Sequence, residues 1–292
     1  MYHLVYAVIY LLSLLPLRVL FILSDLFFII IFHMWGYRRK VVQKNLELAF
    51  PEKSEKERFV IEKKYYRNLV DSIFETIKLF SASDKFLTSH VTGDYSLIDE
   101  YFHKGQKAQL MLGHHFNWEL SNLFGGLRTR QKFLGVYMPL KSKTSDRLFK
   151  KMRSRTGTIL IPATNMIRSM LPYRNDVYIL CLMADQTPAT PSHAYWVNFF
   201  NRPTAFLKGG EKGAIAGNVP VLFAYFIKRK RGYYKLSIKM GEANPSSLLP
   251  GELTYRYAKF MEQTIREDPA MWLWSHRRWK HEWKPEYGEV LK

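Results

Sequence analysis

The sequence predicts an α/β fold: a central, largely parallel sheet flanked by helices, with a hydrophobic membrane helix at the N-terminus. Two observations predict the sheet. Beyond residue 105, short apolar runs alternate with helical patterns, and each run is continuously apolar rather than alternating. Strands have this composition when helices cover both faces of a parallel sheet. The third observation is an almost wholly apolar start over residues 1–35, which predicts the membrane helix.

Residues 1–35 are expected to form a membrane anchor that enters or spans the bilayer as a bent helix. Only Pro16, Arg18 and Asp25 interrupt the apolar run. Proline at this place should kink or restart the helix. Arg18 and Asp25 are seven residues apart, so they could pair on one face of the helix. The alternative is a buried two-helix hairpin within a soluble core.

Residues 36–105 are expected to form a basic juxtamembrane segment followed by amphipathic helices. Three basic residues at 38–40 directly follow the apolar start. Basic residues beside a membrane segment stay on the cytoplasmic side and are attracted to anionic headgroups. Ser54 and Glu57 form a capping box that begins a helix, which continues as an apolar stripe at helical spacing. The catalytic body is therefore expected on the cytoplasmic face.

Residues 106–292 are expected to form the α/β core as one domain. The predicted strands are 108–112, 133–137, 158–161, 177–184 and 219–227. A basic turn at 228–231, followed by glycine, could close a hairpin into a further strand at 236–238. No internal repeat, low-complexity tract or Pro/Gly-rich linker divides this part of the chain.

Composition limits the functions that this chain can have. Its 44 Lys and Arg against 25 Asp and Glu give a formal charge of +19 at pH 7, so an anionic partner is expected. A hydrophobic share of 47% excludes a disordered chain. The single cysteine, Cys181, cannot form an intramolecular disulfide, and no zinc-ligand spacing is present, so no metal is expected. No nucleic-acid-binding motif is present, so nucleic acid is not an expected partner.

The stretch 113–120 contains the residues on which the catalytic prediction depends. His114 follows the predicted strand 108–112, at the sheet edge where ligands bind in open α/β folds. A strand-to-helix turn could bring His114 and Glu119 together, and a histidine held by a carboxylate is a general base. No Ser, Cys or Thr nucleophile stands beside them, so direct transfer onto an activated hydroxyl is favoured over a covalent enzyme intermediate.

Several short motifs, in order along the chain, resemble the lipid A late-acyltransferase branch of the lysophospholipid acyltransferase superfamily. His114, four residues and then Glu119 match the H-x4-D/E motif, and Asn117-Trp118-Glu119 is typical of this branch. The other matching pieces are 36–40, 45–46, 50–52, 137–139, 153–157, 184–186 and 272–280. The Phe-Pro-Glu-Gly-Thr block of glycerophosphate-type relatives is absent, which favours the lipid A-like branch. The resemblance covers nearly the whole chain.

This resemblance implies a membrane-bound enzyme that moves a fatty acyl chain from acyl carrier protein or acyl-CoA to a hydroxyl or amine of a lipid. A lipid A precursor is the favoured acceptor, as in O-acyltransferases of the lauroyl or myristoyl type. His114 would be the base and Glu119 its partner. Four further residues would bind substrate: Asn117, Arg153, Arg155 and Asp185. The enzyme would lie on the cytoplasmic face of a bacterial inner membrane, among anionic lipids, with no cofactor beyond the acyl donor.

Three alternatives stay open. Phe116 stands where the family often has glycine, so the acceptor could be a different lysolipid or an aminolipid. A condensation-type acyltransferase with an HHxxxD motif would use His115 as its base instead. A non-catalytic, basic membrane-binding protein would need only the positive surface.

Overall fold

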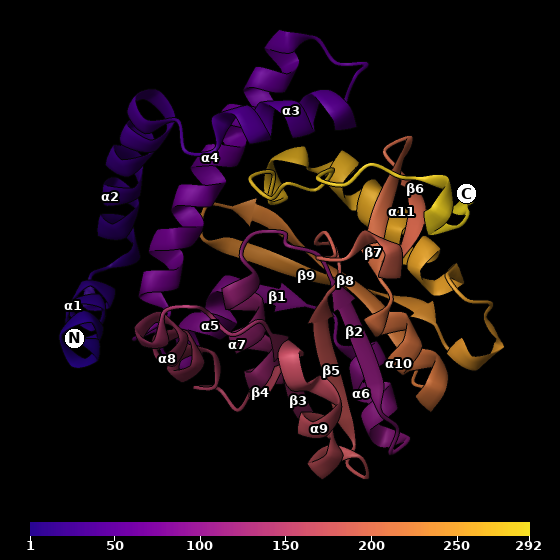
Figure 1. Cartoon of the computed structure of the whole chain (residues 1–292). Helices are drawn as coiled ribbons and strands as arrows, with labels where there is room; N and C mark the ends of the chain where they lie inside the picture. The colour runs from indigo at the N-terminus through magenta and orange to yellow at the C-terminus, as the bar shows by residue number, and fades with distance from the viewer.

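The computed structural model describes residues 1–292 and confirms the predicted α/β class (Figure 1). Every predicted strand is present, and so is the hairpin that follows the basic turn. The strands of the large sheet are β1 (Val91–Gly93), β2 (Ala108–Leu112), β3 (Lys132–Tyr137), β4 (Ile159–Pro162), β5 (Tyr178–Met183), β8 (Val221–Lys230) and β9 (Tyr233–Glu242).

The seven strands follow the order β1-β9-β8-β2-β5-β3-β4, and only the β8–β9 pair is antiparallel. β2 and β5 lie at the centre, and all five residues of β2 are buried. This burial explains why the run at 108–112 is continuously apolar or neutral. The one strand that the sequence did not predict here is β1, because three residues are too few to show a period.

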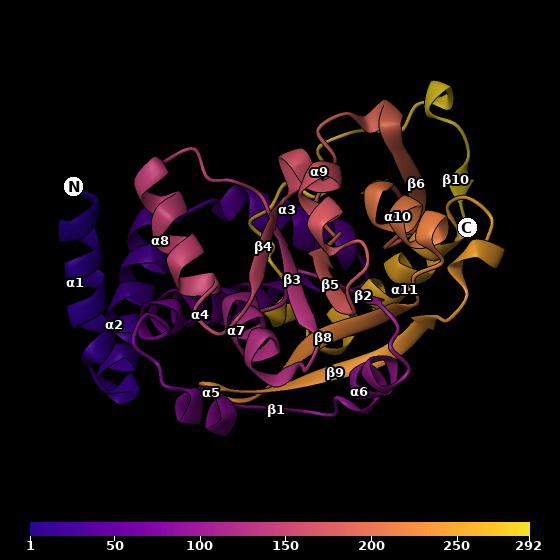
Figure 2. The same ribbon diagram turned by 90° about the horizontal axis from the view of Figure 1, so that it is seen from below.

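Helices flank this sheet (Figure 1, Figure 2). They are α1 (Tyr2–Leu14), α2 (Leu17–Ile29), α3 (Arg39–Ala49), α4 (Glu55–Lys78), α5 (Asp84–His90), α6 (Ser96–His103), α7 (Trp118–Arg128), α8 (Lys143–Arg153), α9 (Met166–Met170), α10 (Gly209–Gly217) and α11 (Glu252–Glu267). The predicted capping box is present: Ser54 and Glu57 bond each other's backbone at the start of α4.

The apolar N-terminus folds as two helices that separate at Pro16, as predicted. α2 continues through a π-helical stretch (Ile30–Trp35), and the combined helix Leu17–Trp35 is long and apolar enough to cross a membrane, with a mean hydropathy of 2.1. Both helices lie at one edge of the molecule beside α4 (Figure 1, Figure 2). Leu20 and Phe28 of α2 are buried in the core.

The predicted pairing of Arg18 with Asp25 is wrong. Asp25 instead binds Arg67 of α4 and Arg231 of the β8–β9 turn, with Arg231 Nη2 2.9 Å from Asp25 Oδ1. Residues seven apart do share a helix face, but here tertiary packing brings two other guanidinium groups to the carboxylate. Asp25 is therefore part of the contact between α2 and the body of the protein.

A second, three-stranded sheet was not predicted. It consists of β6 (Ala194–Phe199), β7 (Arg202–Leu207) and β10 (Val290–Leu291), in the order β10-β6-β7. Phe200 and Asn201 join β6 to β7 with φ values of +52° and +55°. Two consecutive positive φ values are the geometry of a type I′ hairpin turn. The asparagine between two apolar runs was the available sequence signal for this hairpin.

One hydrophobic core of 58 buried residues contains members from 1–35, 36–105 and 106–292. The division of the chain into these three segments stays a prediction.

Candidate active site

His114 lies just beyond the C-terminal end of β2. The neighbouring parallel strand β5 pairs Met183 with Leu112, so both strands leave the sheet at the same edge. As a result, Asp185 reaches His114: the imidazole Nδ1 is 2.6 Å from Asp185 Oδ1, and the His114 backbone N–H donates to Oδ2 at 2.7 Å. This edge is where ligands bind in parallel sheets.

The carboxylate of Asp185 is only 2% exposed and accepts a third hydrogen bond, from Trp272 Nε1 at 2.7 Å. Burial opposes ionisation of this group. The charge and hydrogen bonds of His114, together with the Trp272 donor, outweigh burial and hold the pKa of Asp185 well below its usual range. Asp185 is therefore an anion that faces the His114 ring at neutral pH.

The ring of His114 is oriented so that one nitrogen faces Asp185 and the other lies on the opposite side of the ring, beside Gln186. An ionised carboxylate only accepts hydrogen bonds, so the Nδ1 that faces Asp185 must carry a proton. In the neutral ring, Nε2 then holds a lone pair; it lies 3.1 Å from the Gln186 side-chain nitrogen. The His114 side chain keeps 16% of its surface exposed, so a substrate can reach this nitrogen. This is the tautomer that a general base needs.

Glu119, the expected partner of His114, does not contact it. Its carboxylate is buried at the start of α7 and is bound by Arg153 from the end of α8, with Arg153 Nε 2.8 Å from Glu119 Oε2 and Arg153 Nη2 on Oε1. The expected pairing is thus corrected to two separate pairs, His114–Asp185 and Arg153–Glu119. The physical reason is register: β5 delivers a carboxylate to His114 from 71 residues away, a proximity that local spacing cannot reveal.

Of the two candidate arginines, only Arg153 joins this arrangement. Burial alone would lower its pKa, but the hydrogen bonds and charge of Glu119 raise it, so the guanidinium stays charged. Its Nη1 is not used by Glu119, and the side chain is 20% exposed. Arg155 is exposed and makes no side-chain hydrogen bond or ion pair.

The chain as a whole is similar to a known protein family. The family model described as "Bacterial lipid A biosynthesis acyltransferase" matches residues 1–281. The chain belongs to this family. It is therefore an acyltransferase of lipid A biosynthesis, and its substrates are a lipid acceptor and an acyl donor. A search of curated proteins found no match.

In this acyltransferase, Asn117 makes its side-chain contacts within the protein, and its contact with substrate stays a prediction. Its side-chain oxygen accepts from the backbone N–H groups of Glu119 and Leu120, which caps α7. Its amide nitrogen donates to Glu75 Oε2 at 3.0 Å, and the residue is buried. Both amide atoms are thus used within the protein, and Asn117 fixes the backbone on which Glu119 stands.

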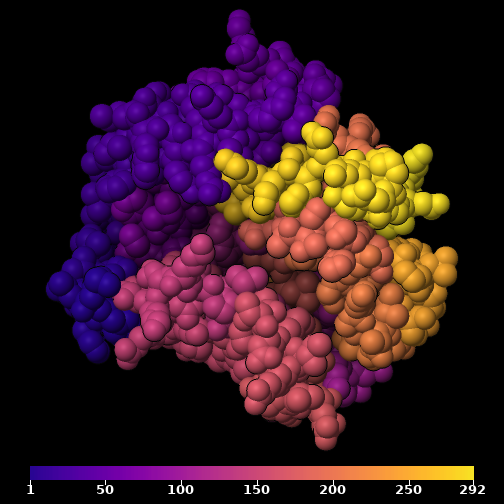
Figure 3. Space-filling model, viewed as in Figure 1, coloured from indigo at the N-terminus to yellow at the C-terminus, as the bar shows by residue number.

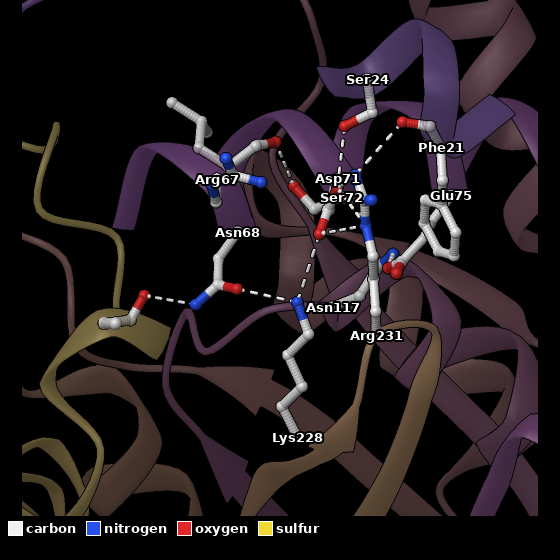
Figure 4. Close-up of polar contacts among 12 residues, drawn as sticks. Phe21, Ser24, Arg67, Asn68, Asp71, Ser72, Glu75, Asn117, Lys228 and Arg231 are labelled. Atoms are coloured by element: carbon white, nitrogen blue, oxygen red, sulfur yellow. Dashed lines mark hydrogen bonds and ion pairs between the residues drawn. The ribbon is translucent and has the colours of Figure 1, made fainter. Parts of the chain in front are cut away.

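Glu75 belongs to a buried polar network that the sequence analysis missed (Figure 4). Its carboxylate also accepts from Tyr234 Oη at 2.8 Å. Burial raises the pKa of Glu75 to about 7, against the opposing effect of its hydrogen-bond donors. One turn earlier on α4, Asp71 binds Lys228 and Arg231 from the β8–β9 hairpin. The sequence signal for this network was the pair Asp71 and Glu75, two carboxylates four residues apart beside an apolar stripe with helical spacing.

The adjacent His115 is placed differently from His114. It is buried, its Nδ1 has no hydrogen-bond partner, and its Nε2 lies 3.4 Å from Thr264 Oγ1. Burial lowers the pKa of His115 to about 4, so the ring is neutral and closed to substrate. This position does not favour the alternative in which His115 is the base.

Gly113 allows His114 and Asp185 to approach. A Cβ atom at this position would lie 2.0 Å from Met261 Cε and 3.1 Å from Asp185 Oδ2. The methionine tip could move, but the carboxylate is held by three donors. Glycine is therefore the residue that this close packing requires.

Proposed function

We propose that this acyltransferase moves a fatty acyl chain from acyl carrier protein or acyl-CoA to a hydroxyl of a lipid A precursor, with His114 as the general base. The observation that supports this best is the His114–Asp185 pair, because Asp185 fixes Nδ1 as the nitrogen that carries the proton in the neutral ring and so leaves Nε2 as its basic nitrogen, at the ligand-binding edge of the sheet. The lauroyl or myristoyl class of acyl chain is part of this proposal.

The reaction balances without a covalent enzyme intermediate. Nε2 of His114 takes the proton of the acceptor hydroxyl as that oxygen attacks the thioester carbonyl carbon. The new C–O bond gives a tetrahedral oxyanion, and the C–S bond then breaks. The imidazolium returns its proton to the leaving thiolate, which releases the free thiol of the donor. Asp185 stabilises the imidazolium throughout.

Arg153 is the group proposed to stabilise the oxyanion or bind a substrate oxygen through its free Nη1. Glu119 would then act as a positioning residue that fixes the guanidinium by two hydrogen bonds. Arg155, two residues further along the chain, is exposed, and its contact with substrate remains part of the proposal.

The proposed location is the cytoplasmic face of the inner membrane. The helix Leu17–Trp35 is long enough to cross a bilayer, and Leu11, Ile22 and Leu26 direct more than half of their surface outward. Basic residues at 38–40 follow the helix directly, where anionic headgroups would attract them. Anionic lipids and acyl carrier protein, which is acidic, are the proposed partners of the positive surface.

Acyl transfer from labelled acyl carrier protein to a lipid A precursor tests this proposal in membranes containing the full chain. His114→Ala should lower kcat by about 10²- to 10⁴-fold, since that is the usual contribution of a general base. His115→Gln is the matched control and should keep turnover within a few fold. Equal turnover by wild type and His114→Ala would reject the proposed base. Parallel assays with acyl-CoA, and with C12 and C14 chains, identify the donor and chain length.

A further inference from the structure

A basic cleft begins one residue beyond the groups that contact His114. Gln186 lies beside His114 Nε2, and the next residue, Thr187, lines a cleft of about 280 Å³. The lining residues come from three parts of the chain: Arg38, Thr187, Pro188, Ala189, His276, Arg277 and Lys280. Figure 3 shows this face of the molecule, where the yellow C-terminal segment borders the indigo N-terminal part and a hollow.

The cleft has an uncompensated positive charge. Arg38, Arg277 and Lys280 line it, and no carboxylate does. None of these three cations forms an ion pair, whereas Arg153 of the candidate active site is paired with Glu119. Three cations around one concave surface create a positive potential that attracts and holds an anion.

Hydrogen bonds from several elements hold the walls of the cleft in place. Arg38 Nη1 donates to the Ser275 carbonyl at 3.0 Å, which sets the guanidinium against the C-terminal segment. Asn45 of α3 donates to the carbonyl of His276 at 2.7 Å. Thr187 Oγ1 donates to the Arg278 carbonyl at 2.8 Å, which joins the two opposite walls. Such a preformed site loses little freedom when a ligand binds.

The shape, charge and position of this cleft point to a ligand class. Guanidinium and ammonium groups bind the oxygens of phosphate esters with charge-assisted hydrogen bonds. Arg38 also stands three residues after Trp35, the last residue of the candidate membrane helix, so the proposed membrane location would place it near the lipid headgroups. We propose that the basic cleft binds a phosphate ester of the lipid acceptor while the acceptor hydroxyl reaches His114. This inference rests on the proposed function for the identity of the acceptor.

The test removes charge from the cleft without removing a structural contact. Arg277 and Lys280 are exposed, and their side chains make no hydrogen bond, so Arg277→Gln/Lys280→Gln should fold normally. The matched control is Arg202→Gln/Lys212→Gln, which removes two other exposed and unpaired charges. Both pairs are made in the full chain, with His114 intact and with His114→Ala.

Two measurements are made in detergent micelles. In the His114→Ala background, equilibrium binding compares a phosphorylated lipid A precursor with the same lipid after phosphatase treatment. The cleft variant should bind the phosphorylated lipid about tenfold or more weakly and the phosphatase-treated lipid unchanged. With His114 intact, the acceptor KM should rise by a similar factor and kcat should change less.

Three results would overturn the inference: equal binding by the cleft variant and its control, equal weakening toward both lipids, or a rise in the KM of the acyl donor alone. The last result would place a donor phosphate in the cleft. Failure of the proposed reaction is a separate result, because it would show as absent turnover by the enzyme with His114 intact. Phosphate-dependent binding in the His114→Ala background would be unaffected by that failure.

Discussion

His114 takes its orientation from Asp185, and Glu119 takes its place from Arg153, so two carboxylates of one site have different partners. Both carboxylates are nearly inaccessible to solvent. A buried carboxylate must be paired or neutralised, since an isolated charge in the protein interior is strongly unfavourable. Removal of one partner of either pair should therefore lower stability, and single substitutions should separate this effect from the proposed role in the reaction.

Asp185→Asn should lower kcat by on the order of 10³- to 10⁴-fold with a small change in KM. An amide NH₂ facing Nδ1 would favour the tautomer that carries its proton on Nε2, which cannot act as a base. Steady-state acyl transfer measures the effect. Asp176→Asn, which only removes a surface pair with Lys132, is the control. A kcat for Asp185→Asn within tenfold of wild type would contradict the assigned orientation of His114.

Arg153→Met should destabilise the fold by about 3–5 kcal/mol, because it leaves the buried carboxylate of Glu119 without a partner. Arg153→Lys should lower the free energy of unfolding by less. It should still reduce activity, since an ammonium group cannot reproduce the bidentate contact with Glu119. Urea denaturation measures both variants. Arg155→Met is the matched control and should stay within about 0.5 kcal/mol of wild type. Equal stability of the 153 and 155 methionine variants would contradict the ion pair.

At the scale of elements, α2 has two faces with different environments. One face contacts α4 and places Leu20 and Phe28 in the core, while Ile22 and Leu26 point away from the protein. Arg231 adds polar contacts by bridging Asp25 of α2 to α4. Deletion of residues 1–35 would therefore remove core residues together with the proposed membrane anchor. Substitutions on one face of α2 at a time separate the two effects.

Ile22→Ser/Leu26→Ser should reduce membrane association while leaving the melting temperature nearly unchanged, because both side chains are already exposed in the folded chain. Leu20→Ala should do the opposite: it should lower stability by about 2–5 kcal/mol, as large-to-small changes in a core do. Membrane fractionation and thermal denaturation measure the two effects. Unchanged membrane association of the double variant would mean that another surface of the protein makes the membrane contact.

At the scale of the whole molecule, two polar clusters on α4 join it to α2, to the β8–β9 hairpin and to the start of α7. Asp71 connects Ser24 of α2 with Arg231 (Figure 4). Glu75 connects Asn117 with Tyr234. Through the Asn117 cap, the Glu75 cluster reaches the backbone of Glu119. The position of the chain at the start of α7 thus depends on α4, whose Glu75 precedes Asn117 by 42 residues.

The protonation of Glu75 predicts a pH dependence of stability. Burial raises the pKa of Glu75 to about 7 from its usual value of 4.5, so between these values the folded state binds more protons than the unfolded state. Stability must then fall as pH rises through this range. Relative to Glu75→Gln, the wild type should lose about 2–3 kcal/mol of unfolding free energy between pH 5 and pH 8. Denaturant titrations at both pH values measure this difference, and parallel curves would contradict it.

The sequence by itself determined the α/β class, the positions of the main strands, the break at Pro16 and the place of His114 at the edge of the sheet. These features follow from local patterns: continuous apolar runs, a residue without an amide hydrogen, and a strand end. Only the tertiary structure decided that Asp185 holds His114, that Arg153 holds Glu119, and that Asn117 and Glu75 support the loop from within. Those partners are 34 to 71 residues apart, and strand register and helix packing bring them together. Such long separations along the chain follow no helix or strand period, so no local sequence pattern can predict which residues will be partners.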